Sequence, residues 1–470
     1  MEHTFDLTCD VAVIGAGTAG LTAARKALDQ GARIVLIDDK FAGTVCANVG
    51  CMPSKLIIAA SKAAHGAQTA DIFGIDCQGV TIDGPAVMGR LRAERDKFVA
   101  STKKSLDDFP AGSLIKARAR FAGPTSLVLD DGRTIGAKSI VIAVGGAPIV
   151  PDAFSGLGAL CLTHETIFEI EDLPRSIAVI GAGPIGLELA QALARLGVET
   201  TLFDQAQTIA KVADDDVQSC IQKALRDDLT LHLGVTTSAR REGDRALIQW
   251  SGASNGQAQF DRVLIATGRP PQLDALDLEK SGIARTDKGA PLYNRETMQC
   301  GDAPIFIAGD ASADAPILHE AAAEGRIAGR NAATFPSVTR TPRMTKFSLI
   351  FSQPALAMVG TEPDEETIVG RASYDDQGRA KVEAQALGRV LVYAEPTRGR
   401  ITGAMLFCPG AEHMAHLFAL AISRGVTATE MLAQPFYHPT LEEGLKAALR
   451  EICRAVPASG DFDRTDPPGA

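Results

Sequence analysis

Hydrophobic residues near the N-terminus fall into two short runs, separated by a glycine-rich turn and a stretch of helical character. Val11-Ala12-Val13-Ile14 is typical of a short buried strand, and residues 33–38 form a second apolar run. Between them, residues 15–20 are rich in glycine and residues 21–30 are expected to be helical, with Gly31 closing the helix. Residues 10–38 therefore predict a strand–turn–helix–strand unit.

The same order of elements recurs in the middle of the chain. Residues 177–180 predict a strand, residues 181–186 a second glycine-rich turn, and the following helix extends to Leu196. A strand that ends at Asp204 completes the unit. Two such units in one chain predict two dinucleotide-binding domains.

The remaining segments predict smaller elements and a change of architecture after Pro342. Residues 52–105 are predicted to be helical, and residues 112–148 to form short strands. Beyond Pro342, short strands alternate with amphipathic helices, which predicts a third, α+β domain. The helices of that domain are expected at residues 415–424 and 441–456.

The predicted fold class is α/β, with two Rossmann-like dinucleotide-binding domains and a C-terminal α+β domain. The first domain is expected to be discontinuous, because apolar segments that include residues 305–307 resemble strands returning to its sheet. The expected boundaries are 1–148 and 268–342 for the first domain, 149–267 for the second, 343–458 for the third, and 459–470 for a disordered tail.

Composition narrows the class of protein without identifying it. The chain has 470 residues, of which 46% are hydrophobic and 22% charged, as expected for several globular domains. Its net charge of −10 argues against a nucleic-acid-binding role. No secretory signal or membrane-spanning run is recognised, and the nine irregularly spaced cysteines do not form a secreted disulfide pattern, so we expect a cytoplasmic protein.

Each glycine turn has the residue types that a pyrophosphate site needs. The first glycine allows a sharp turn, the second lets the backbone approach the phosphates, and the third lets the helix pack on the strand. An acid at the end of the next strand is expected to accept hydrogen bonds from an adenosine ribose. The predicted cofactor-binding residues are Gly15, Gly17, Gly20 and Asp38 in the first turn, and Gly181, Gly183, Gly186 and Asp204 in the second.

The residues after Asp204 indicate which nicotinamide cofactor the second site takes. A carboxylate at this position binds a ribose 2′-hydroxyl and repels a 2′-phosphate. Gln205, Ala206 and Gln207 follow, with no basic residue that would hold a phosphate. The sequence therefore favours NAD over NADP.

Cys46 and Cys51 are the leading candidates for chemistry. A zinc half-site, a structural disulfide and a redox-active pair all use two close cysteines, but no second ligand pair lies near this one. Reactivity requires a thiolate, so the pair is expected to have a depressed pKa beside a histidine cation. His438 is the candidate base, and Glu443 could fix its tautomer and stabilise the imidazolium.

Four segments together carry a resemblance to a known family. Cys46 and Cys51 are followed by Met-Pro-Ser-Lys, Gly309-Asp310 closes an apolar run, His-Glu-Ala-Ala occupies 319–322, and Pro-Phe-Tyr-His-Pro-Thr-Leu-Glu-Glu occupies 435–443. From residue 8 to about 455 the chain resembles the pyridine nucleotide-disulfide oxidoreductases, most closely their dihydrolipoamide dehydrogenase branch.

The resemblance implies a role for each matching residue. The first turn would bind FAD and the second NAD, Cys51 would face the flavin, and Cys46 would attack the substrate disulfide. Lys55 and Glu188 would form an ion pair beside the flavin, and Asp310 would hold its ribityl chain. Gly43, Thr44 and Gly145 would lie at the FAD site, and Gly268 at a nucleotide site. The family takes its histidine and glutamate from the partner subunit, which implies a homodimer whose active sites are shared.

Departures from the family pattern concern the substrate more than the reaction. Val45 replaces a hydroxyl residue before Cys46, Val144 replaces a threonine, and Phe436 replaces a second histidine found in many relatives.

The first hypothesis for the function is oxidation of dihydrolipoamide, carried on a lipoyl domain or lipoyl carrier protein, with NAD. Reduction of another disulfide or of a metal ion is the second; mercuric reductase-like enzymes carry a C-terminal vicinal cysteine pair, whereas Cys453 stands alone. A docking or redox-sensing flavoprotein subunit is the third. No resident metal site is predicted.

Overall fold

The chain forms two compact units in the computed structural model, which describes residues 5–287 and 289–456. The first unit combines the described residues of three segments, 5–56, 89–149 and 268–343. The second combines 57–88, 150–267 and 344–456. Both therefore contain segments far apart in the sequence.

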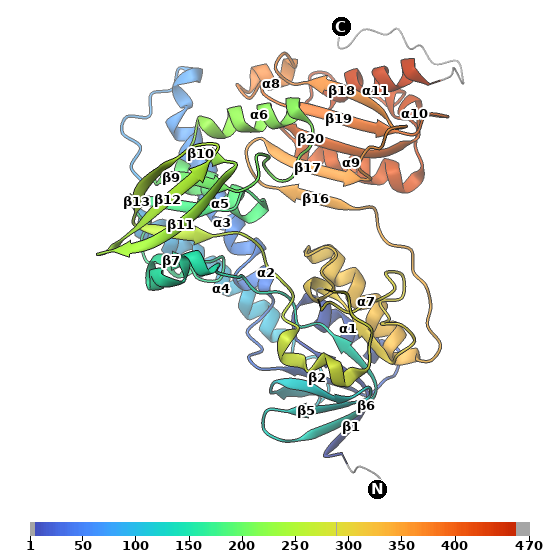
Figure 1. The fold of residues 1–470 in the computed structure, drawn as a ribbon. Helices are drawn as coiled ribbons and strands as arrows, with labels where there is room; N and C mark the ends of the chain where they lie inside the picture. The colour runs from blue at the N-terminus through green and yellow to red at the C-terminus, as the bar shows by residue number, and fades with distance from the viewer. Residues whose placement is uncertain (1–4, 288, 457–470) are drawn as a thin grey trace. The chain divides into compact units, whose positions relative to one another are not determined.

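A seven-stranded mixed sheet is the centre of the first unit (Figure 1). Its order is β3 (Leu114–Lys116), β2 (Ile34–Asp38), β1 (Leu7–Ile14), β6 (Thr134–Ile142), β5 (Ser126–Leu129) and β4 (Ala119–Gly123), and β15 (Ile305–Ile307) pairs with β6. The pairs among β3, β2, β1, β6 and β15 are parallel, whereas β4 and β5 pair in antiparallel fashion. The alternating side chains of β1 enter two cores, one on each face of the sheet.

Helices α1 (Thr18–Asp29) and α7 (Leu318–Thr334) lie together on one face of this sheet (Figure 1). They approach so closely that a Cβ atom on Gly329 would lie 2.1 Å from the Ala23 carbonyl oxygen. Small side chains therefore set the distance between the two helices. The unit also contains α2 (Val45–Asn48), η4 (Asp274–Leu276), η5 (Leu278–Ser281) and η6 (Gly309–Ser312).

The second unit contains a five-stranded parallel sheet covered by a small antiparallel one (Figure 1). The parallel sheet has the order β10 (Thr230–Leu233), β9 (Glu199–Asp204), β8 (Ser176–Ile180), β14 (Arg262–Ile265) and β7 (Cys161–Leu162). The antiparallel one is formed by β11 (Val235–Glu242), β12 (Arg245–Gly252) and β13 (Gly256–Phe260), and Phe203, Ile248 and Phe260 share a core between the two sheets. The helices of this part are α5 (Pro184–Arg195), α6 (Asp215–Arg226), η2 (Asp152–Leu160) and η3 (Ile167–Glu169).

A separate antiparallel sheet occupies the C-terminal part of the second unit. Its order is β16 (Phe347–Ile350), β17 (Ala355–Gly360), β20 (Ile401–Cys408), β19 (Arg389–Ala394) and β18 (Ile368–Ser373). Buried residues of the sheet and of α9 (Ala411–Arg424), α10 (Ala428–Leu432) and α11 (Leu445–Ala455) form one core; α8 (Gly378–Val382) and η7 (Glu442–Gly444) complete the part. Two further helices, α3 (Cys51–Gln68) and α4 (Gly84–Lys104), each contribute residues to both units and flank η1 (Ala70–Phe73).

The predicted fold class is confirmed, because two nucleotide-type parallel arrangements and a separate antiparallel sheet are present. The continuous helix predicted from Leu441 is wrong at its start. The Gly444 N–H donates to the Leu441 carbonyl in a 3-10 turn, and α11 begins only at Leu445. The predicted tail at 459–470 lies outside the described residues. None of the described helices combines the length and apolarity that crossing a membrane requires.

Candidate functional site

The first glycine turn, between β1 and α1, is shaped by close backbone contacts. Gly15 has a φ of +103°, and a Cβ atom there would lie 2.3 Å from the Ala143 carbonyl oxygen. A Cβ atom on Gly20 would lie 1.8 Å from the Gly15 carbonyl oxygen. At Gly17, by contrast, no heavy atom comes within 4 Å of the Cβ position, and the N-terminus of α1 has no side-chain cap. The turn therefore leaves backbone N–H groups open on one side.

Asp38, at the end of β2, is held at this turn. The Ala16 N–H donates to Asp38 Oδ2 at 2.9 Å, and the Phe41 N–H donates to Oδ1 at 2.7 Å. The carboxylate is half-buried. It therefore joins the glycine turn to the loop after β2 and retains acceptor capacity, since each oxygen has further lone pairs.

The second turn, between β8 and α5, repeats this arrangement. Gly181 has a φ of +111°, and a Cβ atom there would lie 2.5 Å from the Ala266 carbonyl oxygen. A Cβ atom on Gly186 would lie 1.9 Å from the Gly181 carbonyl oxygen, whereas the space at Gly183 is open. Asp204 Oδ2 accepts a hydrogen bond of 2.5 Å from the Ala182 N–H.

Both turns fit the pyrophosphate of a dinucleotide. Each presents an open glycine and the uncapped N-terminus of a twelve-residue helix, where N–H groups and the helix dipole favour phosphate. Gly145 and Gly268, which follow the ends of β6 and β14, have φ angles of +72° and +139° and open space at their Cβ positions. The first turn, Asp38, Gly145 and Gly268 belong to the first unit, and the second turn and Asp204 belong to the second. That each turn holds a nucleotide stays a prediction.

Cys46 and Cys51 lie on two consecutive helices, α2 and α3, that follow the first turn. After Gly43, with a φ of +95°, Thr44 caps α2 by accepting a hydrogen bond of 3.2 Å from the Ala47 N–H. Cys46 lies within α2 and Cys51 is the first residue of α3. Both are half-buried thiols, and the Cys51 side chain is close enough to raise the pKa of Cys46. The C-x4-C segment therefore folds so that its two thiols interact.

The surroundings of Cys46 within its own chain raise the pKa of its thiol. The hydrogen bond with Cys51 raises the pKa of Cys46 above its usual value, burial raises it further, and the charge of Lys55 lowers it only in part. The pKa is raised because two adjacent thiols do not readily ionise together. Cys46 therefore needs a base to become reactive, and a depressed pKa beside a histidine cation stays a prediction.

Lys55 and Glu188 fall in different compact units, so their predicted ion pair stays a prediction. Lys55 lies one turn after Cys51 on α3 and is half-buried. Glu188 is buried on α5, and its Oε1 accepts a hydrogen bond of 3.0 Å from the Phe351 N–H. A buried carboxylate with a fixed orientation is unusual for a helix surface and supports a specific role.

Asp310 belongs to a charged network that the sequence analysis missed. Arg269 donates to Asp310 Oδ2 at 2.6 Å, and both side chains are largely buried. Glu324, which is fully buried on α7, accepts hydrogen bonds from the Gly309 N–H at 2.7 Å and from Arg343 at 2.7 Å. Arg269 and Glu324 thus fix the turn that carries Asp310. The available signals were an arginine directly after Thr267-Gly268 and an acid in an Ala- and Gly-rich helix.

His438 and Glu443 form a hydrogen-bonded pair before α11. His438 Nδ1 lies 2.9 Å from Glu443 Oε2, and the Thr440 N–H approaches the same oxygen at 3.3 Å. The Glu443 side chain is 11% exposed, whereas that of His438 is 66% exposed. Glu443 therefore orients one ring nitrogen and leaves Nε2 facing outward, as a base acting on another molecule or subunit requires.

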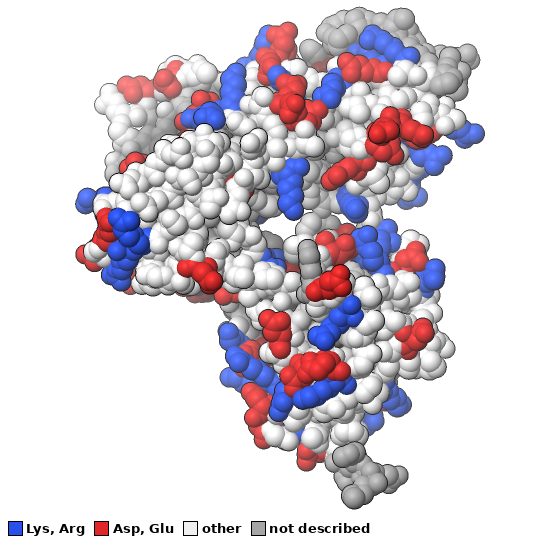
Figure 2. Space-filling view, in the orientation of Figure 1, with Lys and Arg blue, Asp and Glu red and all other residues white. Residues whose placement is uncertain are grey.

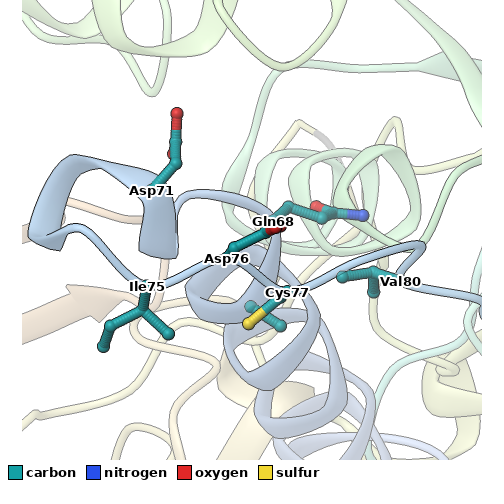
Figure 3. Close-up of a pocket in the computed structure, with 7 residues that line it drawn as sticks. Gln68, Asp71, Ile75, Asp76, Cys77 and Val80 are labelled. Carbon is teal, nitrogen blue, oxygen red and sulfur yellow. The ribbon is translucent and has the colours of Figure 1, made fainter.

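Two surface features lie apart from these residues. A hollow of about 310 Å³ beside η1 is lined by the end of α3 and the following loop, and contains Cys77 but none of the predicted site residues (Figure 3). On the face drawn in Figure 2, basic and acidic side chains are interspersed. The hollow is therefore not the predicted site.

Comparisons with known proteins agree with this geometry. Residues 9–325 match the family described as pyridine nucleotide-disulphide oxidoreductase, and residues 347–449 match its dimerisation domain, which indicates a homodimer. A mercuric reductase of Streptomyces lividans is 31% identical, over 95% of this chain and 97% of its own length. A dihydrolipoyl dehydrogenase of Bacillus subtilis is 29% identical, over 93% of this chain and 97% of its own.

Solved structures agree at the level of the fold. The HOCl-induced flavoprotein disulfide reductase RclA from Escherichia coli has a TM-score of 0.80 at 22% identity, covering 94% of this chain and 99% of its own. LpdA from Mycobacterium tuberculosis gives the same values. The predicted resemblance is confirmed: the chain belongs to the pyridine nucleotide-disulphide oxidoreductases, a family of FAD-dependent enzymes that use NAD(P)H.

Proposed function

We propose that this protein is a dihydrolipoyl dehydrogenase. It oxidises protein-bound dihydrolipoamide with NAD⁺ through the Cys46–Cys51 pair. The reaction converts a dithiol and NAD⁺ into a disulfide, NADH and one proton. Its physiological substrate is a lipoyl domain or lipoyl carrier protein, and the enzyme is a homodimer with active sites shared between subunits.

The placement of Cys46 in α2 and Cys51 at the start of α3, close enough that Cys51 raises the pKa of Cys46, carries this proposal. Thiol–disulfide exchange needs two sulfurs that can form and break a bond with each other without a large backbone movement. In the oxidised enzyme, a substrate thiolate attacks Cys46, the Cys46–Cys51 bond breaks, and its electron pair remains on Cys51. The second substrate thiol then displaces Cys46 and closes the substrate disulfide.

His438 is the base for these exchanges. It accepts the proton of the attacking substrate thiol at Nε2 while Glu443 holds Nδ1, and it returns a proton to the leaving Cys46 thiolate. The raised pKa of Cys46, caused first by Cys51, supports the need for such a base. The exposure of His438 supports its supply to the site of a partner subunit.

FAD, when bound, would take the electron pair from the dithiol and supply it as hydride to NAD⁺. The residues that would hold it are the first glycine turn, Asp38, Gly43, Thr44, Gly145 and Asp310, in a domain formed by 1–148 and 268–342. Residues 149–267 would form the NAD domain and 343–458 the dimerisation domain. Lys55 and Glu188 would lie beside the flavin.

Asp204 supports NAD as the partner nicotinamide. Its carboxylate can bind a ribose hydroxyl, and it would repel the phosphate of NADP. Its other oxygen accepts the Ala206 N–H at 2.7 Å, and none of Gln205, Ala206 and Gln207, which follow β9 directly, carries a positive charge.

Reduction of a metal ion is the second candidate, because relatives named mercuric reductase are as similar as those named dihydrolipoyl dehydrogenase. Cys453 argues against it. This residue lies in α11, is buried, and its sulfur is 3.4 Å from Thr429 Oγ1. It is therefore not a thiol that could receive a metal ion from solution.

The test is oxidation of NADH and NADPH by the purified flavoprotein with lipoamide, glutathione disulfide, Hg(II) or no acceptor. We expect fast turnover with NADH and lipoamide, and a loss of at least about 10³-fold in Cys46→Ser, because the nucleophile itself is removed. Cys77→Ser is the matched control, since Cys77 is exposed and belongs to the other compact unit.

Each remaining outcome decides between the candidates. Lipoamide turnover that survives in Cys46→Ser would overturn the proposed chemistry. NADPH oxidation that requires Hg(II) and is indifferent to lipoamide would establish the second candidate.

A further inference from the structure

The segment that carries His438 and Glu443 is a long connection without regular secondary structure. It runs from the end of α10 at Leu432 to η7 at Glu442. His438 is exposed, so packing does not hold its ring. A base on such a loop has a defined position only if neighbouring elements fix the backbone.

Tyr374 is the first such anchor. It follows β18 directly, is fully buried, and its hydroxyl donates a hydrogen bond of 2.8 Å to the Leu441 carbonyl. The ring packs against the backbone of Gly444, where a Cβ atom would lie 2.6 Å from the phenol carbon Cζ. Burial raises the pKa of Tyr374 well above its usual value, and Cys408 and Glu442, the titratable groups beside the hydroxyl, raise it further. The hydroxyl therefore remains a donor.

Gln377 is the second anchor, three residues later. Its Nε2 donates to the Thr440 carbonyl at 2.7 Å, while its Oε1 accepts the Ala380 N–H at 2.7 Å and so caps α8. Both ends of the amide are thus used. Because α8 holds the oxygen, the nitrogen is fixed in the direction of Thr440.

The segment that supplies both anchors is itself held in place. Arg389 of β19 donates to Ser373 Oγ at 3.0 Å and to Asp375 Oδ2 at 2.8 Å, on either side of Tyr374. The Tyr374 N–H also donates to the Gly388 carbonyl. The anchors therefore belong to the sheet, and the loop is attached to them.

We propose that Tyr374 and Gln377 are positioning residues, whose hydrogen bonds to two consecutive carbonyls hold His438 and Glu443 in the geometry of a working base. This inference rests on the proposed function, in which His438 is the base for thiol exchange at Cys46. Thr440 and Leu441 lie between the two members of the pair, so both anchors act inside the turn that the Nδ1–Oε2 contact closes. If the turn loosens, Glu443 stabilises the imidazolium less well, and the Cys46 thiolate that this cation favours becomes less populated at neutral pH.

The test uses the full-length flavoprotein, reduced with one equivalent of NADH, and follows alkylation of Cys46 by iodoacetamide. Thiolate displaces iodide, so the rate between pH 6 and 9 reports the thiolate fraction and needs no physiological substrate. A positioned base contributes about 10²- to 10⁴-fold, so partial loss of its position is expected to slow alkylation at pH 7 by about 10-fold. We expect this in Tyr374→Phe, which keeps the ring, and in Gln377→Glu, which keeps the oxygen that caps α8 and removes the donor.

Two readouts separate positioning from general damage. NADH oxidation by ferricyanide, which does not involve a substrate thiol, should remain within about 2-fold of the wild type. Tyr393→Phe is the matched control, because Tyr393 is a buried tyrosine of the same sheet, on β19, and it is expected to react like the wild type. Gln377→Glu keeps the test valid if Tyr374→Phe does not fold.

His438→Ala distinguishes failure of this inference from failure of the proposed function. Slow alkylation in His438→Ala, with wild-type rates in both anchor variants, would overturn the positioning role alone. Wild-type alkylation in His438→Ala would remove the base itself, and the positioning role with it.

Discussion

The two glycine turns have almost the same backbone geometry, but the helices that follow them have different surroundings. In both turns the first glycine lies against the carbonyl oxygen of the residue that follows a neighbouring strand, β6 or β14. The second glycine is open, and an aspartate accepts the N–H of the residue between the two glycines. These contacts involve backbone atoms and one short side chain. They recur because the turn itself dictates them.

The difference begins one turn into each helix. Helix α1 packs against α7 through alanine and glycine, at a distance that admits no larger side chain. Helix α5 instead presents Glu188, Gln191 and Arg195 to polar partners: Glu188 accepts the Phe351 N–H, and Gln191 accepts the Gln353 N–H at 2.7 Å. The same motif can therefore precede an apolar helix contact or a polar attachment to the antiparallel sheet.

The contrast between the two helices is tested most directly by removing a polar side chain of α5, that of Arg195. Arg195 donates to both Asp228 oxygens at 3.0 Å, and the two side chains are only 8% and 9% exposed. Arg195→Met leaves a buried carboxylate without its cation, which is expected to lower the free energy of unfolding by about 3–5 kcal/mol. The measurement is thermal unfolding followed by flavin fluorescence.

Arg25 provides the control, because it is an arginine on α1, the helix that follows the first turn. It is exposed and bonds only to Ser105 among the described hydrogen-bond partners. Arg25→Met is expected to change stability by about 0.5 kcal/mol or less. Equal losses in the two variants would contradict the contrast, and the double variant Arg195→Met, Asp228→Leu should regain part of the loss, since no unpaired charge remains.

The same glycine-to-alanine substitution in each of the two turns should have a different functional result. A Cβ atom on Gly20 or Gly186 would lie within 2 Å of a backbone oxygen, so each Ala variant must displace its own turn. We expect Gly20→Ala to bind FAD at least about 100-fold more weakly, or about 2.8 kcal/mol, and to purify without its yellow colour. Gly186→Ala should stay yellow but raise the KM for NADH by a similar factor.

Flavin absorbance per protein and NADH kinetics measure the two effects, with circular dichroism as the check on folding. A colourless Gly186→Ala, or a yellow Gly20→Ala with a raised KM for NADH, would reverse the assignment of the two sites.

How far the sequence could predict the molecule follows from the range of its contacts. The glycine turns and the cysteine pair were predictable because their partners lie within a few residues or on the adjacent strand. Arg269 and Glu324 were missed because their partners, Asp310 and Arg343, are distant in sequence, and a lone charged residue gives no sign of its partner. The start of α11 was misplaced for a related reason: Leu441 suits a helix, but its carbonyl is bound by Tyr374, from another part of the chain.

The smallest expected effect concerns selection of NADH over NADPH, a role that we propose for Asp204 in the second turn and not for Asp38 in the first. Asp204→Asn keeps the shape of the side chain and removes the charge that would repel a 2′-phosphate. Hydrogen bonds to charged groups contribute about 1.5–3 kcal/mol, so we expect the preference for NADH over NADPH, measured as the ratio of kcat/KM values, to fall about 10-fold or somewhat more. Asp38→Asn should leave that ratio unchanged and affect only flavin binding.

An unaltered ratio in Asp204→Asn would show that the choice between NADH and NADPH does not rest on this charge. The two aspartates would then differ only in the nucleotide each receives, and selectivity would have to lie in the loop after β9, where Ala206 bonds to the same carboxylate.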